Sequence, residues 1–279
     1  MEKIMLRYIA MLFLCSSLYV QSNTDKSNIE NDSLKIAMSH ESIAEIKNLT
    51  QIEITQIGDV ENAESNNATF ITFPAMSLKV GETGIVMRDL ESYQGIAASV
   101  EVINVNGATA TAKILPFTQL QQPYLPTPRI TPQKNDKVIF RSYNNKAFLI
   151  APDEKTYNAI KAQYPFIDFV SSDLLMGFLN SRGKHDPTSK TLPAACNEYA
   201  VGLVFIMGSN TLAVLNCQNL KTIHQHNITL PAHITPQSPF YTRIDFDGGG
   251  SLTYMFASKK SRKDYFGYYD SLIQAGNAQ

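Results

Sequence analysis

Three histidines in the last quarter of the chain are the residues whose type and spacing come closest to metal chemistry. His224 and His226 alternate along Thr222–Ile228, a stretch that indicates a β-strand, so both side chains are expected on one face. His233 is near enough in sequence to join them as a third ligand. No cysteine or carboxylate completes the set locally, so we favour two solvated histidines on an open strand face and expect no bound metal.

A second possible cation site is the stretch Asp245-Phe246-Asp247-Gly248, which has the alternating carboxylates and the glycine of half a calcium-binding loop. The bidentate glutamate that such a loop needs later in its sequence is missing. A glycine-rich surface turn is therefore the favoured interpretation.

The chain carries no local catalytic signature. G-x-S-x-G, H-E-x-x-H, a Walker phosphate loop and G-x-G-x-x-G are all missing from the sequence, and no local spacing couples a serine, a histidine and an aspartate. A triad assembled from distant positions would not be visible in this way. We expect a protein that is not an enzyme and that uses no cofactor.

Cys196 and Cys217 are the two cysteines outside the N-terminal leader, and an even pair in an exported chain is most simply a disulfide. Glu198–Met207 and Thr211–Asn216 indicate strands around a Gly-Ser-Asn turn, so the bond would close the open end of a hairpin. Two buried free thiols are the alternative, and a zinc site is disfavoured because no partners stand at zinc spacing.

Residues 1–22 have the pattern of an export signal. Lys3 and Arg7 supply the positive start, residues 5–20 the apolar run, and Val20-Gln21-Ser22 a cleavage site with small residues. A single-pass anchor is one alternative, although the apolar run is short and broken. A lipoprotein modified at Cys15 is another, although bulky residues precede this cysteine. We expect an exported protein with no transmembrane segment after leader removal, placed in the periplasm or at the cell surface.

The composition indicates an ordinary packed protein. The 279 residues are 44% apolar and 18% charged, with a formal net charge of −1. Nucleic acid is not expected as a partner, because phosphate binding requires a clustered basic surface.

The chain divides into five segments, and their mixture of helices and strands predicts an α+β (mixed) fold. A signal peptide (1–22) is followed by a flexible lead-in (23–50) with a short helix near its end. A small β domain (51–115), a Pro-rich connector (116–132) and a mixed α/β domain (133–279) complete the chain.

Turn signals at close spacing predict that the β domain is a small barrel or sandwich. Gln51–Ile57 and Thr69–Phe73 are expected to pair as a hairpin, and Asn106-Gly107 is the strongest hairpin turn in the chain. Further strands are expected at Ile85–Arg88, Ala97–Val105 and Ala108–Leu115.

The last segment predicts a βαβ-like unit and a disulfide-closed hairpin. Asp153 is well placed to cap a helix that ends near Gln163. The other expected elements are strands at Lys137–Arg141, Ala147–Ile150, Ile167–Val170 and Thr222–Ile228, and helices at Ser172–Leu179 and around Tyr265–Leu272.

Two C-terminal stretches are candidates for contact with a partner. The aromatic pairs around Gly267 favour a helix that docks onto the domain over an exposed patch. The densest basic run comes directly before them and consists of Lys259, Lys260, Ser261, Arg262, Lys263 and Asp264. A short solvated loop is the default interpretation of such a run.

Several motifs in combination resemble one family. They are LPTPR at Leu125–Arg129, NDKVIFRSYNNKAFLIAP at Asn135–Pro152, SSDLL at Ser171–Leu175, FPAMSLKVGETG at Phe73–Gly84, SPFYTR at Ser238–Arg243 and YFGYYDSL at Tyr265–Leu272. The chain resembles, from about Gln51 to Leu272, the N-terminal domain of the plasminogen-binding surface proteins of helical, gut-colonising Gram-negative bacteria. Both Cys196 and Cys217 match family positions, which supports the disulfide.

The resemblance implies an envelope protein that captures host plasminogen through the lysine-binding sites of kringle domains. Such a site needs an ammonium and a carboxylate at a fixed separation, which a C-terminal lysine supplies. The family's Lys-rich tail has no counterpart before the end at Gln279, so the family's kringle-binding residues cannot be carried over, and an internal substitute is one alternative. If the basic run is helical, Lys260 and Asp264 would lie on one face and mimic the pair. The alternative is a periplasmic or outer-envelope scaffold that binds another bacterial protein and not plasminogen.

Overall fold

The computed structural model describes residues 40–62, 69–120, 124, 130–230, 234–244 and 257–278, all within one compact unit, Leu34–Gln279. The leader, most of the lead-in, much of the Pro-rich connector, His233 and the stretch Asp245-Phe246-Asp247-Gly248 lie outside the described residues. Among the described helices, none is long and apolar enough to cross a bilayer.

The first sheet contains seven of the described strands, all antiparallel to their neighbours, in the order β1-β7-β4-β5-β6-β3-β2. The strands are β1 (Glu53–Gln56), β2 (Asp59–Asn62), β3 (Thr69–Pro74), β4 (Thr83–Asp89), β5 (Gln94–Asn106), β6 (Thr109–Leu115) and β7 (Lys137–Phe140). The turn between β5 and β6 is the predicted Asn-Gly turn, with Gly107 at φ +56°. The sheet therefore extends past Leu115, because β7 joins it.

This sheet is curled until its two edges meet. Its outermost strands, β1 and β2, are consecutive in sequence and are separated only by Ile57 and Gly58. The Ile57 N–H donates to Asp136 O at 3.0 Å, whereas the Gly58 N–H donates to Thr72 O at 2.7 Å, so one bent segment bonds both ends of the sheet. A side chain at position 58 would start 3.2 Å from that carbonyl oxygen, which favours glycine there.

The expected hairpin between Gln51–Ile57 and Thr69–Phe73 is wrong. Strand β1 pairs with β7, and the short strand β2, which the sequence did not indicate, is the partner of β3. The interior of the curled sheet is nevertheless a small apolar core, as a small barrel requires. Its buried side chains include Ile57, Ile71, Phe73, Val86, Val100, Val102, Val138 and Phe140. The fold class, a barrel-like sheet followed by a mixed α/β part, is confirmed.

The second sheet has five of the described strands in the order β12-β11-β10-β8-β9. They are β8 (Lys146–Ile150), β9 (Asp168–Phe169), β10 (Leu203–Met207), β11 (Thr211–Asn216) and β12 (Thr222–Asn227). Strand β8 is parallel to both β9 and β10, while β11 and β12 add antiparallel strands. The predicted βαβ unit is thus β8, helix α3 (Glu154–Gln163) and β9, and Asp153 caps the helix by accepting from the Thr156 N–H at 2.8 Å.

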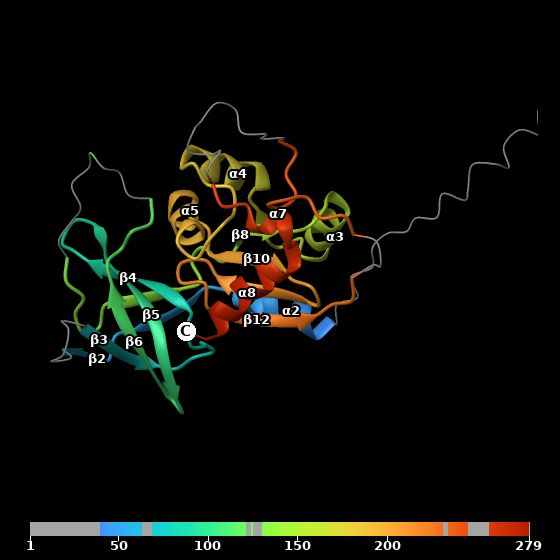
Figure 1. The fold of residues 1–279 in the computed structure, drawn as a ribbon. Helices are drawn as coiled ribbons and strands as arrows, with labels where there is room; N and C mark the ends of the chain where they lie inside the picture. Colours follow the sequence, from blue (N-terminus) through green and yellow to red (C-terminus); the bar gives the residue numbers. More distant parts are fainter. Residues whose placement is uncertain are drawn as a thin grey trace, which may run out of the picture. The chain divides into compact units, whose positions relative to one another are not determined.

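Helices cover both faces of the second sheet (Figure 1). Alternate residues of β8 point to opposite faces, so Phe148 packs with one core cluster and Leu149 with the other. On the Phe148 face lie α4 (Ser172–Ser181), α5 (Thr191–Tyr199) and α8 (Tyr265–Asn277), and on the other lie α2 (His40–Leu49) and α3. A four-residue helix, α7 (Lys260–Lys263), precedes α8. The division into segments 51–115, 116–132 and 133–279 stays a prediction.

Candidate functional site

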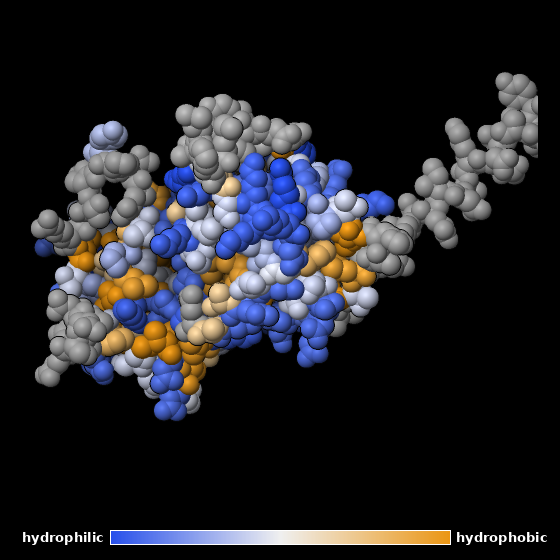
Figure 2. Space-filling model, viewed as in Figure 1, coloured by the Kyte–Doolittle hydropathy of each residue, from blue (hydrophilic) through white to orange (hydrophobic). Residues whose placement is uncertain are grey.

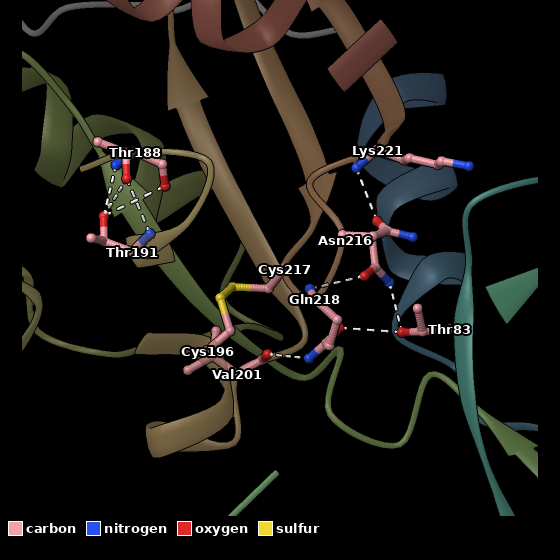
Figure 3. The surroundings of a disulfide bond; sticks show 10 residues. Thr83, Thr188, Thr191, Cys196, Val201, Asn216, Cys217, Gln218 and Lys221 are labelled. Atoms are coloured by element: carbon pink, nitrogen blue, oxygen red, sulfur yellow. Dashed lines mark hydrogen bonds between the residues drawn. A yellow bond between two sulfur atoms is a disulfide. The ribbon is translucent and has the colours of Figure 1, made fainter. Parts of the chain in front are cut away.

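The disulfide joins Cys196 to Cys217, with Cα atoms 5.8 Å apart and both residues completely buried (Figure 3). Its structural context differs from the expected one. Glu198 belongs to helix α5, as Cys196 does, and strand β10 begins only at Leu203. The bond therefore ties a helix to the end of strand β11 and does not close a hairpin strand to strand.

Residues beside the disulfide hold the two sheets together (Figure 3). The Asn216 side-chain amide donates to Thr83 Oγ1 at 2.9 Å, and the Thr83 hydroxyl donates to Gln218 Oε1 at 3.2 Å. The Gln218 side-chain amide in turn donates to the carbonyl oxygen of Val201 at 2.8 Å, and Val201 lies just before Leu203, the first residue of the next strand. The disulfide thus lies beside the point where β4 of the first sheet meets the second.

A buried arginine reinforces the same junction. The Arg141 guanidinium binds the Glu82 carboxylate with Nε–Oε2 at 2.6 Å and Nη2–Oε1 at 3.0 Å, and their side chains are 3% and 1% exposed. It also donates to the carbonyls of Ser77 at 2.9 Å and Asn48 at 3.2 Å. The sequence showed Arg141 only as the end of a strand, so nothing in it indicated this role. These contacts make the junction a structural site.

The basic run lies at the surface in two short pieces. Lys260, Arg262 and Lys263 are exposed on α7, and Figure 2 shows hydrophilic side chains gathered over the region where Figure 1 places this helix. Lys259 precedes α7 and is partly exposed. The default interpretation is a short solvated loop; the run is solvated, but its residues Lys260–Lys263 form the helical turn α7.

The predicted pairing of Lys260 and Asp264 on one helical face is also wrong in detail. Helix α7 ends at Lys263, and Asp264 has an extended backbone with φ −148°. Its carboxylate caps α8 by accepting from the Gly267 N–H at 2.9 Å. Asp264 nevertheless stays exposed beside the cations, as a negative charge whose position the cap sets.

A buried carboxylate 74 residues earlier anchors α7. Asp186 accepts from the Lys260 N–H at 2.6 Å and from the Ser261 hydroxyl at 2.6 Å, and His185 Nδ1 lies 2.7 Å from the same carboxylate. Burial would raise the pKa of Asp186, but the hydrogen bonds from His185 and Ser261 outweigh it, so the pKa is lowered. This serine, histidine and aspartate do not form a catalytic triad, because Ser261 bonds the carboxylate and the group is buried.

The aromatic residues of α8 dock the helix, as expected. Tyr265 and Tyr269 are buried in the core of the second sheet, with ring centroids 4.7 Å apart. Tyr268 reaches from the same helix to the carbonyl of Pro187 at 2.6 Å, directly after Asp186. Helix α8 is therefore bonded to the same loop whose Asp186 anchors α7.

The paired histidines do lie together, but they are not solvated. His224 Nε2 is 3.0 Å from His226 Nδ1, His224 Nδ1 is 2.9 Å from Glu45 Oε2, and Tyr164 Oη is 3.2 Å from His226 Nε2. Burial lowers the pKa of both histidines, that of His226 to about 4. Within the described ranges, no group of three or more His, Cys, Asp and Glu side chains could hold a metal ion. These contacts link β12 to α2 through Glu45 and to the C-cap of α3 through Tyr164.

The fold and these contacts define an α+β protein of two joined sheets that holds a short basic segment at its surface on a buried carboxylate. The chain belongs to the family described as "Plasminogen-binding protein pgbA N-terminal", which matches residues 54–273. It is 40% identical over 204 residues to the plasminogen-binding protein PgbA of Helicobacter pylori strain J99, and equally to that of strain 26695. The matched region is 73% of this chain and 44% of each relative, so the chain spans less than half of their length.

Proposed function

We propose that this chain is part of an exported cell-envelope protein that binds host plasminogen through the basic segment of α7. The observation that carries the proposal is that exposed Lys260, Arg262 and Lys263 stand beside exposed Asp264 in a segment fixed by Asp186. The names of its relatives support plasminogen as the partner.

A kringle lysine-binding site takes a cation together with an anion. The proposed segment offers both without a terminal lysine, because Lys260 or Lys263 supplies the ammonium and Asp264 supplies the carboxylate. The anchoring bonds to Asp186 reduce the conformational entropy that a flexible loop would lose on binding. A weak, lysine-sensitive interaction is expected from so few charged groups, since exposed ion pairs each contribute only about 0–1 kcal/mol.

Export is the second part of the proposal. The leader pattern of residues 1–22 supports it, and so does the buried Cys196–Cys217 disulfide, because such bonds persist in oxidising compartments. Proteolysis of intact cells tests the location, since a surface protein is cleaved while a periplasmic one is protected until the outer membrane is opened. Protection would favour the envelope scaffold that binds another bacterial protein.

The binding test uses the chain without its leader on immobilised plasminogen. The expected result is retention that a free lysine analogue abolishes and that the double variant Lys260→Ala, Lys263→Ala reduces strongly. Lys155→Ala is the control, because Lys155 is also exposed but lies on α3. Retention that persists in saturating lysine analogue, or no retention at all, would overturn the proposal.

The variant Asp264→Asn tests the negative charge of Asp264 while the fold is kept. Asparagine caps a helix as well as aspartate does, so this variant keeps the bond to the Gly267 N–H while it removes the charge. Weaker binding with unchanged stability is expected if Asp264 is the anion that the kringle site recognises. Unchanged binding would remove Asp264 from the proposed site.

A further inference from the structure

A crevice lies where β8 and β9 end. The two strands are adjacent and parallel, and the helices that follow them pack on opposite faces, α3 against the side of Leu149 and α4 against the side of Phe148. In sheets of parallel strands, ligands bind outside the carboxyl ends at such a reversal. A pocket of about 310 Å³ occupies this position, which neither the disulfide nor the basic segment uses.

Aromatic rings form the centre of this pocket. Tyr157, Phe169 and Tyr241 line it, and the ring centroids of Tyr157 and Tyr241 are 5.3 Å apart. Tyr157 and Phe169 are 7% and 8% exposed, so their rings are fixed by packing. The Tyr157 hydroxyl is hydrogen-bonded to Ser172, and that of Tyr241 to Glu154. The polar lining of the pocket therefore includes aromatic rings whose phenol groups are already hydrogen-bonded.

Opposite charges stand at the two ends of this aromatic surface. Glu154 and Lys161 both line the pocket from α3, seven residues apart and therefore separated by about 10 Å along the helix. The Lys161 ammonium lies 5.3 Å from the centroid of the Tyr157 ring. Among the described residues, neither Glu154 nor Lys161 is in an ion pair, whereas Arg243 at the rim is neutralised by Asp173 at 2.6 Å.

From this arrangement we propose that the crevice binds a short peptide with free termini. The ammonium of the peptide pairs with Glu154, its carboxylate pairs with Lys161, and an apolar or aromatic side chain between them contacts Tyr157 and Tyr241. An extended tripeptide spans about 10 Å, comparable to the rise of α3 between Glu154 and Lys161. The volume also lies at the lower end of the range for small-ligand sites, about 300–1,000 Å³.

The test is titration calorimetry of the chain without its leader with the tripeptide Ala-Phe-Ala. The expected result is binding that weakens at least about tenfold when either the amino terminus is acetylated or the carboxyl terminus is amidated. Glu154→Gln should weaken the free tripeptide but not the acetylated one, and Lys161→Gln should weaken the free tripeptide but not the amide. Lys155→Gln on the same helix should change nothing, because Lys155 does not line the pocket.

Two outcomes would overturn the proposal. One is no binding of the free tripeptide at about 1 mM, and the other is equal binding of the free and blocked peptides, which would mean that the charges do not recognise the termini. Glu154 and Lys161 are exposed, so these substitutions leave the core intact and circular dichroism can verify the fold. The measurement does not involve plasminogen and is independent of the proposed function.

Discussion

The Ser261 hydroxyl donates to Asp186 Oδ1 at 2.6 Å, although the two residues are 75 positions apart and almost completely buried. The same carboxylate accepts from the Lys260 N–H, so the first two residues of α7 are held by one distant side chain. The surface position of the basic segment therefore depends on a buried charge in the loop between α4 and α5.

We expect Asp186→Asn to lower the free energy of unfolding by about 1.5–3 kcal/mol, because hydrogen bonds to a charged acceptor are lost and an amide donor faces the Lys260 N–H or the Ser261 hydroxyl. Amide hydrogen exchange at Lys260 and Ser261 should accelerate as well. Ser261→Ala removes the hydroxyl's hydrogen bonds to Asp186 and Ser238 and should cost about 1–3 kcal/mol. Unchanged exchange in α7 would show that Asp186 does not anchor it.

The histidine chain predicts that acid destabilises the protein. Burial, followed by the neighbouring His224, lowers the pKa of His226 from 6.5 to about 4. The unfolded chain therefore binds the proton first, and the free energy of unfolding should fall as the pH is lowered from 6.5 to 4. His226→Gln should flatten this dependence in urea unfolding. Asp186, whose pKa lies below 3.8, contributes stability that is lost only in more acidic solution.

Removal of the disulfide should destabilise the fold without changing its topology. The double variant Cys196→Ala, Cys217→Ala opens a loop with a sequence separation of 21, and chain entropy predicts a loss of about 3 kcal/mol. Urea unfolding of the variant and of the oxidised wild type measures the difference. A loss well below about 1 kcal/mol would show that the bond adds little to the packing around it.

The free energy of unfolding should change differently when one or both residues of the buried Arg141–Glu82 pair are replaced. Arg141→Met leaves the Glu82 carboxylate buried without its cation and should cost about 3–5 kcal/mol. Adding Glu82→Met removes the uncompensated charge, so the double variant should be more stable than Arg141→Met alone. Full recovery is not expected, because Arg141 also bonds the carbonyls of Ser77 and Asn48. Equal stability of the single and double variants would contradict this explanation.

Asp264 should contribute to stability through its cap and not through its charge. Asp264→Ala should lower the free energy of unfolding by about 1 kcal/mol, since the Gly267 N–H loses its acceptor. Asp264→Asn should remain within a few tenths of a kcal/mol of the wild type. Thermal unfolding of the two variants side by side distinguishes the roles, and equal losses would contradict the cap.

The amino-acid sequence by itself determined the features that depend on near neighbours. The alternation in Ala108–Leu115 predicted β6, the Asn106-Gly107 turn predicted its hairpin with β5, and Asp153 was correctly placed as a helix cap. The pairing of Cys196 with Cys217 was also predicted. These signals are local because turn geometry and side-chain periodicity act over a few residues.

Only the tertiary structure decided which distant segments meet. It placed β7 in the first sheet and β8 in the second, although a few residues separate them, because strand pairing depends on non-local register. It put Cys196 in a helix, since burial of α5 outweighed the strand-like residues that follow. The contact of Asp186 with Ser261 and the pocket between α3 and α4 likewise arise from packing across the fold, which no local spacing encodes.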